Sequence, residues 1–506
     1  MIYDAIIIGG GVIGLSVLRS ALLAGYTAVL IERNADLCDG ASGRNSGVLC
    51  TGVDAPSGSL ERALIRDSIS RVREFCGEHN VPMRECGSLV CLWPWDEDED
   101  EDEKKSEWKF DVDENSSSSR ARLMRVLHES HVAGDKDATF LDSEEVAALE
   151  PSLSSKCRGA VHIPGETVVD PWLFCLALAV HSREMAEHHG TESNIIRTGK
   201  EVVMESSSFD ANKGVWNVAI RGTPPTPNNN DADGVDGTTT ISARCIINAA
   251  GIDSDIVQLS ASFASRNTVC KLAPPTFEAH PRRGQYKIFA APTEGGGAFV
   301  DYNGVDSEWP RVPRTVPARP IQPVPSQFTK GIFVYSTLYN QIVVGPTAQD
   351  QSSRADDTLD PNVAQVLTSH ASRVLGPEFN DSDVLGEYVG IRPGTSERDY
   401  QIHLHCSTNF ITVGGIRSTG LTASLGIGRH VVQCLLPAVV PHARRDLGGE
   451  SSSMMCSPPT PLPNVKELVD QYHARGDGKV VVGGHAYRVT HPLTRLGWGA
   501  RTGLAA

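Results

Sequence analysis

A glycine-rich turn near the start of the chain has the residue types and spacing that bind a diphosphate. Gly9, Gly11 and Gly14 directly follow an apolar run at residues 3–8 and open a segment with helical periodicity. In such a turn the first glycine permits a tight bend, the second lets the backbone approach a diphosphate, and the third lets the helix pack closely on the strand. The helix start adds N–H groups and partial positive charge, which favour an anion. The predicted contacts are Gly9, Gly11, Val12, Ile13 and Gly14.

An acidic residue stands where a dinucleotide places its adenosine ribose. Glu32 ends a second apolar run, at residues 27–31, and completes a strand–turn–helix–strand unit of the expected length, about 30 residues. Its carboxylate can accept hydrogen bonds from both ribose hydroxyls and would repel a 2′-phosphate, which disfavours NADP. We expect Glu32 and the adjacent Arg33 to contact the adenosine end of the cofactor.

The Gly- and Ser-rich segment at residues 39–49 follows the second strand directly. Taken alone, it could wrap a diphosphate and reach a ring system, or it could be a surface loop. The segment from Gly43 to Gly52 resembles the second flavin-contacting segment of the D-amino-acid-oxidase superfamily of FAD-dependent oxidoreductases. More narrowly, it is similar to anaerobic-type glycerol-3-phosphate dehydrogenases and L-2-hydroxyglutarate dehydrogenases. The resemblance implies FAD as the cofactor, with contacts from Ser42, Arg44, Asn45 and Ser46.

Further segments resemble other cofactor-binding parts of this superfamily. The apolar run at residues 243–250 ends in small residues, and a buried parallel strand of that kind leaves room for a cofactor at its carboxyl edge. The run at residues 410–414 leads into a second glycine turn and a helix that we expect to extend to about residue 436. The start of that helix would stabilise negative charge on a reduced flavin. The implied contacts are Val203, Ala249, Gly251, Gly415, Thr419, Gly420, Leu421 and Thr422.

Arg392 ends an apolar run directly before Pro393, where a ladder of strand hydrogen bonds should stop. A guanidinium presents a planar fork that matches a carboxylate or a phosphate, although such a side chain can also form an ordinary surface ion pair. The run resembles the G-V/I-R-P segment of glycerol-3-phosphate dehydrogenases, in which the arginine holds the substrate anion. The resemblance implies the same role for Arg392, and Arg398 is a second candidate for it.

The identity of the catalytic base is open. Relatives carry a histidine where this chain has Cys50, and that histidine would accept the substrate proton. A thiol with its ordinary pKa of about 8.5 is a poor substitute. Cys50 could act as a thiolate base, attach to the flavin through a thioether, or have lost a catalytic role, and a neutral structural role is favoured. By position, His162, His403 and His405 are alternative bases.

The resemblance implies an enzyme that transfers a hydride from a small anionic 2-hydroxy acid or glycerol 3-phosphate to flavin N5. A quinone, an electron-transfer protein or oxygen would then be the final electron acceptor. An L-amino acid or an N-methyl amino acid would fit a single arginine nearly as well. A flavin-binding assembly or regulatory protein with little turnover is a further alternative, which Cys50 favours.

The order of the predicted elements indicates an α/β fold with two domains. The first is a discontinuous, Rossmann-like FAD-binding domain, and the second is an α+β substrate domain built on a mainly antiparallel sheet. We expect the cofactor domain at residues 1–80, 155–258 and 386–440, and the substrate domain at residues 81–154 and 259–385. Residues 93–120 form an acidic, low-complexity insertion, and residues 441–506 form a C-terminal extension.

The charge, cysteine content and hydropathy of the chain exclude several classes of protein. The 506 residues carry a formal net charge of −16, part of which comes from eight consecutive acidic residues at 96–103, and this disfavours nucleic-acid binding. The twelve cysteines show no metal-ligand spacing and are typical of free thiols in a reducing compartment. No apolar run is long enough to span a membrane, and because the first strand begins at residue 3 we expect no cleaved signal or transit peptide. We therefore expect a cytoplasmic protein without a transmembrane segment, while an organelle or peripheral membrane contact stays compatible.

Overall fold

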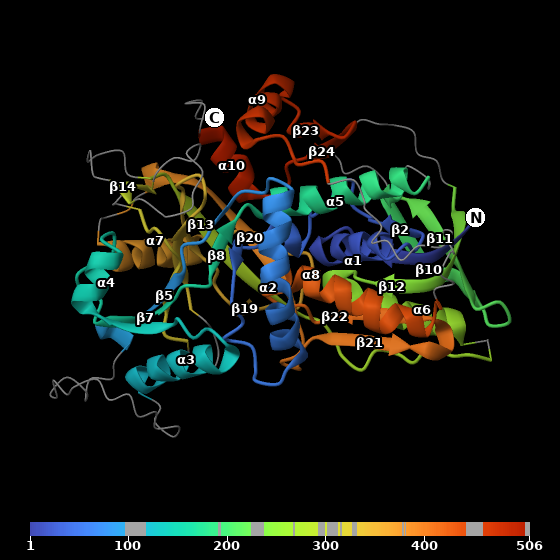
Figure 1. Cartoon of the computed structure of the whole chain (residues 1–506), viewed down its shortest axis with the longest axis horizontal. Helices are drawn as coiled ribbons and strands as arrows, with labels where there is room; N and C mark the ends of the chain where they lie inside the picture. Colours follow the sequence, from blue (N-terminus) through green and yellow to red (C-terminus); the bar gives the residue numbers. More distant parts are fainter. Residues whose placement is uncertain are drawn as a thin grey trace, which may run out of the picture.

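Two large sheets lie side by side in this computed structural model, each with its own helices (Figure 1). The acidic insertion predicted at residues 93–120 falls mostly outside the described part, apart from a short 3-10 turn at Pro94–Asp96 and the first residues of α3 (Ser119–Ala133). The structure describes residues 1–96, 118–190, 194–223, 237–266, 269–291, 299–300, 312–313, 316–325, 331–376, 379, 381–441 and 459–500.

The first sheet is the Rossmann-like part. Its eight strands are β1 (Ile2–Ile8), β2 (Ala28–Ile31), β9 (Ile196–Arg197), β10 (Lys200–Asp210), β11 (Val215–Gly222), β12 (Thr239–Asn248), β21 (Gln401–His405) and β22 (Phe410–Gly414). Its centre is parallel, because β1 pairs in parallel with β12 and β2, and β22 runs parallel to β12. Ala5 and Ile7 enter one apolar core, while Ile6 and Ile8 enter another on the opposite face. Burial on both faces explains why β1 is an unbroken apolar run.

Helices cover this sheet and meet one another closely. α1 (Val12–Leu23) contacts both α5 (Pro171–His188) and α8 (Gly420–His430), while α8 also contacts α2 (Leu60–Glu78). α6 (Ser254–Ser265) packs against β10 and β22. The helix expected to reach residue 436 is α-helical only to His430 and continues as a π-helical turn at Val431–Leu435.

Two glycines let α8 approach its neighbours. A Cβ added at Gly428 would lie 2.6 Å from the Ser16 carbonyl oxygen of α1, and one added at Gly426 would lie 2.4 Å from the Leu64 carbonyl oxygen of α2. Only glycine permits backbones to pack this closely. α8 is therefore packed at backbone contact distance against both α1 and α2.

The second sheet has nine strands. They are β5 (Ser88–Leu92), β6 (Thr139–Asp142), β7 (Gly159–Ile163), β13 (His280–Phe289), β16 (Ile321–Pro323), β17 (Phe333–Ser336), β18 (Ile342–Gly345), β19 (Gln349–Asp350) and β20 (Val384–Gly394). Among these described strands, only β16 and β5 pair in parallel, so the expected α/β fold with a mainly antiparallel second sheet is confirmed. α4 (Ser143–Leu149) contacts β6 and β7, and α7 (Pro361–Leu375) contacts β13 and β18.

The strand β20 lies in a different sheet from the one that the predicted domain boundaries imply. β20 pairs with β13 along its length and so belongs to the second sheet, although residues 386–440 were assigned to the cofactor domain. β21, β22 and α8, from the same range, lie with the first sheet. The division of the chain into domains stays a prediction.

Short strands and the C-terminal extension complete the described part. β3 (Val48–Leu49), β8 (Thr167–Val169) and β4 (Met83–Arg84) form a three-stranded sheet, and β14 (Phe299–Val300) pairs with β15 (Val312–Pro313). The extension contains α9 (Val465–Arg475), the hairpin β23 (Lys479–Val482) and β24 (His485–Arg488), and α10 (Pro492–Ala500). It folds back over α5 (Figure 1), where the Trp172 indole N–H donates to the Arg488 carbonyl oxygen at 3.0 Å. No helix among the described residues is both long and apolar enough to cross a membrane.

Candidate functional site

The glycine turn between β1 and α1 forms a cradle without side chains. A Cβ added at Gly14 would lie 1.9 Å from the Gly9 carbonyl oxygen, and one added at Gly9, whose φ is +112°, would lie 2.4 Å from the Ala249 carbonyl oxygen. The end of β12 therefore lies directly beside this turn. Among the described residues, no group accepts from the N–H groups of Ile13 and Gly14. A diphosphate fits these donors.

Glu32 lies at the carboxyl end of β2 and faces the same turn. One carboxylate oxygen accepts from the Gly10 N–H at 2.6 Å, and the other accepts from the Asn34 N–H at 2.7 Å. Burial raises the pKa of Glu32, against the effect of these two hydrogen bonds. The neighbouring Arg33 points elsewhere and pairs with Asp253 at 2.7 Å.

The segment predicted to contact the flavin, residues 39–52 (the flavin loop), lies against the start of α1. The Ser42 hydroxyl accepts from the Val12 N–H at 3.0 Å, which puts it at the predicted diphosphate position. Asn45 shapes the loop, because its amide donates to the Ser42 carbonyl oxygen at 2.7 Å and accepts from the Gly47 N–H at 2.8 Å. The Ser46 hydroxyl accepts from the Val48 N–H at 3.4 Å.

Arg44 makes a contact that its sequence neighbourhood did not indicate. Its guanidinium donates to the Thr490 carbonyl oxygen at 3.3 Å, and it lies 3.5 Å from Asp39. The Thr490 hydroxyl in turn donates to the carbonyl oxygens of Leu37 and Cys38, both at 3.2 Å. The C-terminal extension thus braces the flavin loop, a role that no local pattern signals.

The second glycine turn meets the first. A Cβ added at Gly420 would lie 3.9 Å from the Ile13 side chain, so the starts of α8 and α1 are neighbours. Gly415 has a φ of +64° and begins the turn. Among the described residues, the N–H groups of Gly420, Leu421 and Thr422 have no acceptor. Two open helix starts side by side fit a cofactor that has acceptor groups at more than one point, as FAD does.

The remaining predicted contacts lie just after β12 and on β10. Ala249 and Gly251 follow β12, with Gly251 at a φ of +59°, and Ala249 is buried beside the glycine turn. Val203 lies on β10, where it pairs with Ala219, at partial exposure. Val203 therefore stays a predicted contact that rests on its position in the sheet alone.

Arg392 lies on β20, is partly exposed, and donates to three backbone carbonyl oxygens. Its Nε donates to the Arg282 carbonyl oxygen at 3.4 Å, and its Nη2 donates to those of Arg283 and Thr347 at 3.3 and 2.5 Å. Burial lowers its pKa, and no carboxylate among the described residues pairs with it. The second candidate, Arg398, is exposed on the turn after β20.

Cys50 lies at the α8 start, and the candidate histidines lie elsewhere. The Cys50 N–H donates to the Thr422 hydroxyl at 3.1 Å. His162 lies on β7 with its pKa lowered by burial to about 4, which makes it a weak base. His403 and His405 lie on β21, where burial also lowers their pKa values, and His403 contacts Gln401 at 3.2 Å.

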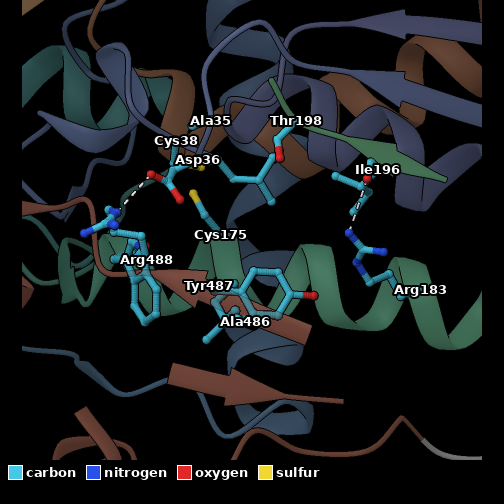
Figure 2. A pocket seen from close by; sticks show the side chains of 13 residues that line it. Ala35, Asp36, Cys38, Cys175, Arg183, Ile196, Thr198, Ala486, Tyr487 and Arg488 are labelled. Carbon is cyan, nitrogen blue, oxygen red and sulfur yellow. Dashed lines mark hydrogen bonds and ion pairs between the residues drawn. The ribbon is translucent and has the colours of Figure 1, made fainter. Parts of the chain in front are cut away.

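A cavity opens beside the flavin loop on the α5 side (Figure 2). It holds about 500 Å³ of empty space, part of it open to solvent, between the segment Ala35–Cys38, α5 and β24. Asp36 pairs with Arg488 at 3.1 Å across it. The thiols of Cys38 and Cys175 meet at its wall, where their hydrogen bond and burial raise the pKa of Cys38. No grouping of His, Cys, Asp and Glu that could hold a metal occurs among the described residues.

Several known proteins are similar in sequence to this chain. The chain is 24% identical over 436 residues to a glycerol 3-phosphate dehydrogenase of Caloramator mitchellensis, covering 86% of this chain and 74% of that protein. It is 24% identical over 439 residues to a glycerol 3-phosphate oxidase of Mycoplasma pneumoniae, covering 85% and 94%. It is 27% identical over 258 residues to a mitochondrial L-2-hydroxyglutarate dehydrogenase of Nematostella vectensis, covering 50% and 48%.

A solved structure shows the same fold. It is the L-alpha-glycerophosphate oxidase from Mycoplasma pneumoniae with FAD bound, which superposes with a TM-score of 0.63 at 22% identity and covers 86% of this chain and 95% of that one. The profile of the family described as FAD dependent oxidoreductase matches residues 4–434. The chain therefore belongs to the FAD dependent oxidoreductase family, and it is an FAD-dependent oxidoreductase.

Proposed function

We propose that this enzyme oxidises the CH–OH group of a small anionic substrate, either glycerol 3-phosphate or an L-2-hydroxy acid, with Arg392 as the anion anchor. The position and hydrogen bonding of Arg392 carry the proposal. Supporting it are relatives whose names state activity on glycerol 3-phosphate or L-2-hydroxyglutarate. At 24–27% identity these names indicate a substrate class rather than one substrate.

The face of β20 that carries Arg392 lies against the flavin loop. Side chains alternate along a strand, so Tyr388, Gly390 and Arg392 share one face. The Tyr388 hydroxyl donates to the Asn45 carbonyl oxygen at 3.0 Å. A Cβ added at Gly390 would lie 2.6 Å from the Arg44 carbonyl oxygen. Arg392 is the next residue on this face, which supports a place beside the cofactor.

The guanidinium keeps one nitrogen for a ligand. Nε and Nη2 of Arg392 donate to backbone carbonyl oxygens, whereas Nη1 has no acceptor among the described residues. A guanidinium fixed in this way loses little side-chain entropy when it binds an anion. Because it is partly buried, its bond to a carboxylate or phosphate would be stronger than a bond at the surface.

FAD, when bound, supplies the two-electron acceptor. Within this chain, the open N–H groups at the α1 start would hold the diphosphate, and those at the α8 start would face negative charge that develops on the ring. Arg392 would orient the substrate, and a base would take the hydroxyl proton. The base is not assigned to a residue, because the resemblance places Cys50, a thiol, where relatives have a histidine.

Cys50 supports a second candidate function, a flavoprotein with little turnover that serves in assembly or regulation. Spectroscopy separates the two. We expect the purified holoprotein to absorb near 370 and 450 nm and to bleach anaerobically with glycerol 3-phosphate or L-2-hydroxyglutarate. Sarcosine and an L-amino acid are tested in the same assay as substrates with a CH–NH group. A yellow protein that no member of this panel bleaches would support the second candidate, and bleaching by an amine alone would overturn the CH–OH assignment.

The electron acceptor is testable in the same preparation. After substrate bleaching, admitting oxygen, a soluble quinone or an electron-transfer flavoprotein shows which one restores the 450 nm band fastest. Rapid recovery with oxygen would identify an oxidase, whereas recovery with a quinone or the protein carrier would identify a dehydrogenase.

A further inference from the structure

The start of α8 differs from most other helix starts in this chain. Side chains cap α2, α3, α4, α5, α7 and α9, whereas α8 begins at Thr419 without a side-chain cap. Threonine is a favourable capping residue, and it stands at the capping position. Something must therefore prevent the Thr419 hydroxyl from binding the first turn of α8.

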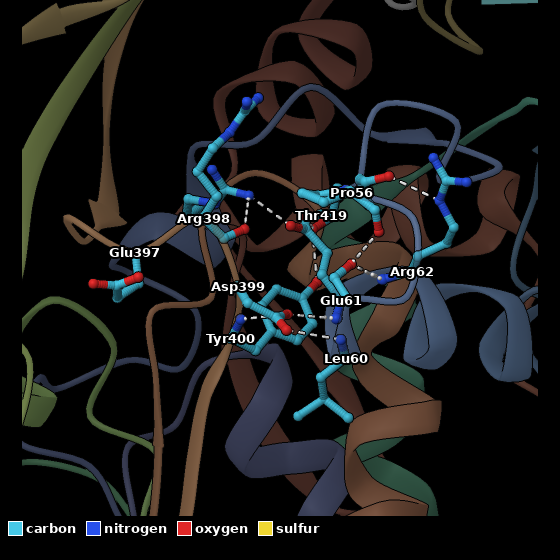
Figure 3. Close-up of polar contacts among 12 residues, drawn as sticks. Pro56, Leu60, Glu61, Arg62, Glu397, Arg398, Asp399, Tyr400 and Thr419 are labelled. Carbon is cyan, nitrogen blue, oxygen red and sulfur yellow. Dashed lines mark hydrogen bonds and ion pairs between the residues drawn. The ribbon is translucent and has the colours of Figure 1, made fainter. Parts of the chain in front are cut away.

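Two side chains engage the Thr419 hydroxyl (Figure 3). It donates to a Glu61 carboxylate oxygen at 2.6 Å, and the Tyr400 hydroxyl lies 2.6 Å from it. A hydroxyl has one proton, and a carboxylate only accepts, so the Tyr400 hydroxyl must be the donor in the second bond. Thr419 is 4% exposed, so water has little access to its hydroxyl.

The backbone of Thr419 is held in a non-capping conformation as well. Its ψ is 6°, whereas the capping residues Ser59, Asp142 and Asn464 have ψ angles of 153°, 179° and 158°. An extended residue is the normal geometry for a side-chain cap. The two bonds at its hydroxyl thus fix Thr419 away from that geometry.

Glu61 is itself firmly placed. Its side chain is 4% exposed, and its second carboxylate oxygen accepts from Arg417 at 2.6 Å. Its N–H and that of Leu60 donate to the Asp399 carboxylate, both at 2.8 Å, so Asp399 closes the start of α2 (Figure 3). One helix start is closed by a carboxylate, and the neighbouring one is kept open.

We propose that Glu61, acting with Tyr400, is a positioning residue that keeps the first turn of α8 open for the flavin. By holding Thr419 away, it leaves the N–H groups of Gly420, Leu421 and Thr422 for an acceptor on the pyrimidine ring of the cofactor. The inference rests on the proposed function, in which this turn meets the flavin. Loss of Glu61 lets Thr419 turn and compete for the same N–H groups.

The Glu61→Ala variant tests this through the flavin midpoint potential and the dissociation constant of FAD. We expect the potential to fall and reduced flavin to bind about two- to fivefold more weakly relative to oxidised flavin, since a helix start contributes about 0.3–1 kcal/mol to a neighbouring negative charge. Simple loss of the carboxylate charge would have the opposite sign, because an anionic reduced flavin would then be favoured. A rise in potential would therefore overturn the proposal.

Three further variants sharpen the test. Glu61→Gln keeps an acceptor for Thr419 without the charge, so the potential should not fall. Thr419→Val cannot cap, so the Glu61→Ala/Thr419→Val double variant should show no fall in potential, and loss of the carboxylate charge should leave its potential at or above the wild-type value. Tyr400→Phe removes the donor without leaving Arg417 unpaired, so it serves if Glu61→Ala does not fold, and its potential should fall in the same direction.

The possible results distinguish failure of the proposed function from failure of the role of Glu61. A wild-type protein that takes up no FAD would overturn the proposed function. A flavoprotein whose potential and FAD affinity are the same in Tyr400→Phe and Glu61→Ala as in the wild type would overturn only the role of Glu61. Asp470→Asn, which breaks an exposed pair with Lys466 on α9, is the matched control and should change neither quantity.

Discussion

The Cys50 N–H donates to the Thr422 hydroxyl at 3.1 Å, which joins the flavin loop to the first turn of α8 across 372 positions of sequence. Cys50 is thereby held at the helix start that faces the proposed flavin position. If Cys50 occupies the position of the catalytic base, as its resemblance to relatives implies, the thiol limits the rate of proton transfer.

We predict that Cys50→His raises kcat with the preferred CH–OH substrate. A general base contributes about 10²–10⁴-fold, so an increase of at least about tenfold is expected if the imidazole reaches the substrate hydroxyl. Single-turnover flavin reduction is the measurement. Cys50→Ser, which keeps the size of the side chain, should leave the rate unchanged, and equal rates in all three proteins would remove Cys50 from the base position.

Arg392→Lys should raise KM for the anionic substrate by about 10- to 100-fold, because a hydrogen bond to a charged group contributes about 1.5–3 kcal/mol. A lysine keeps the charge but loses the fork that the three carbonyl oxygens orient. Steady-state kinetics and the thermal midpoint should be measured together. Arg398→Lys is the control, and a larger effect there than at position 392 would transfer the anchor to Arg398.

Gly14→Ala should prevent folding of the first domain or reduce the free energy of unfolding by more than about 3 kcal/mol, since its Cβ would lie 1.9 Å from the Gly9 carbonyl oxygen. Gly77→Ala offers a matched comparison, because Gly77 is an exposed α2 residue with nothing within 4 Å of an added Cβ. That change should stabilise by about 0.5–1 kcal/mol. Urea denaturation of both variants checks the contrast.

Asp170 joins three parts of the molecule. It caps α5 through the Trp172 and Leu173 N–H groups, and it accepts from the Tyr339 hydroxyl at 2.6 Å and the Thr494 hydroxyl at 3.0 Å. Asp170→Ala should reduce the free energy of unfolding by about 3 kcal/mol, from the lost cap of α5 and from the loss of the carboxylate that accepts from Tyr339 and from the buried Thr494 hydroxyl.

Asp142→Ala is the control for this prediction, because Asp142 caps α4 at an exposed site. Its loss should cost only about 1 kcal/mol. Chemical denaturation gives both values, and limited proteolysis should show α10 released in the Asp170 variant alone. Equal costs in the two variants would show that the contacts to Tyr339 and Thr494 contribute nothing.

Glu32 should make FAD binding sensitive to acid. Burial raises its folded-state pKa above the ordinary value of 4.5, so FAD affinity should fall as the pH drops through that raised pKa and the carboxylate is lost as a ribose acceptor. For the apoprotein the sign is opposite: the folded state binds the proton more readily than the unfolded state, so this group's destabilising effect disappears as the pH falls. FAD titrations from pH 4 to 8 should show the acid step in the wild type and none in Glu32→Gln, which binds more weakly throughout.

The sequence by itself determined the diphosphate-binding turn and the local elements around it, and its resemblance to a family indicated FAD. The turn at Gly9, the alternation along β1 and the acidic end of β2 are local features, because backbone geometry and strand period depend on near neighbours. The same reasoning predicted the second turn at Gly415. Arg392 could be placed on a strand, but not among the carbonyl oxygens that fix its guanidinium.

Tertiary structure alone decided which distant side chains form hydrogen bonds with the turns and helix starts of the predicted cofactor site. The Thr419–Glu61 bond spans 358 positions of sequence, and Thr490 reaches Leu37 across 453. No local pattern encodes such pairs, because they form only when α2, α8 and the C-terminal extension pack on one sheet. The spacing of the glycines predicts a helix start with unbound N–H groups. Whether the Thr419 hydroxyl can bind those N–H groups depends on Glu61 and Tyr400, which only the fold brings near.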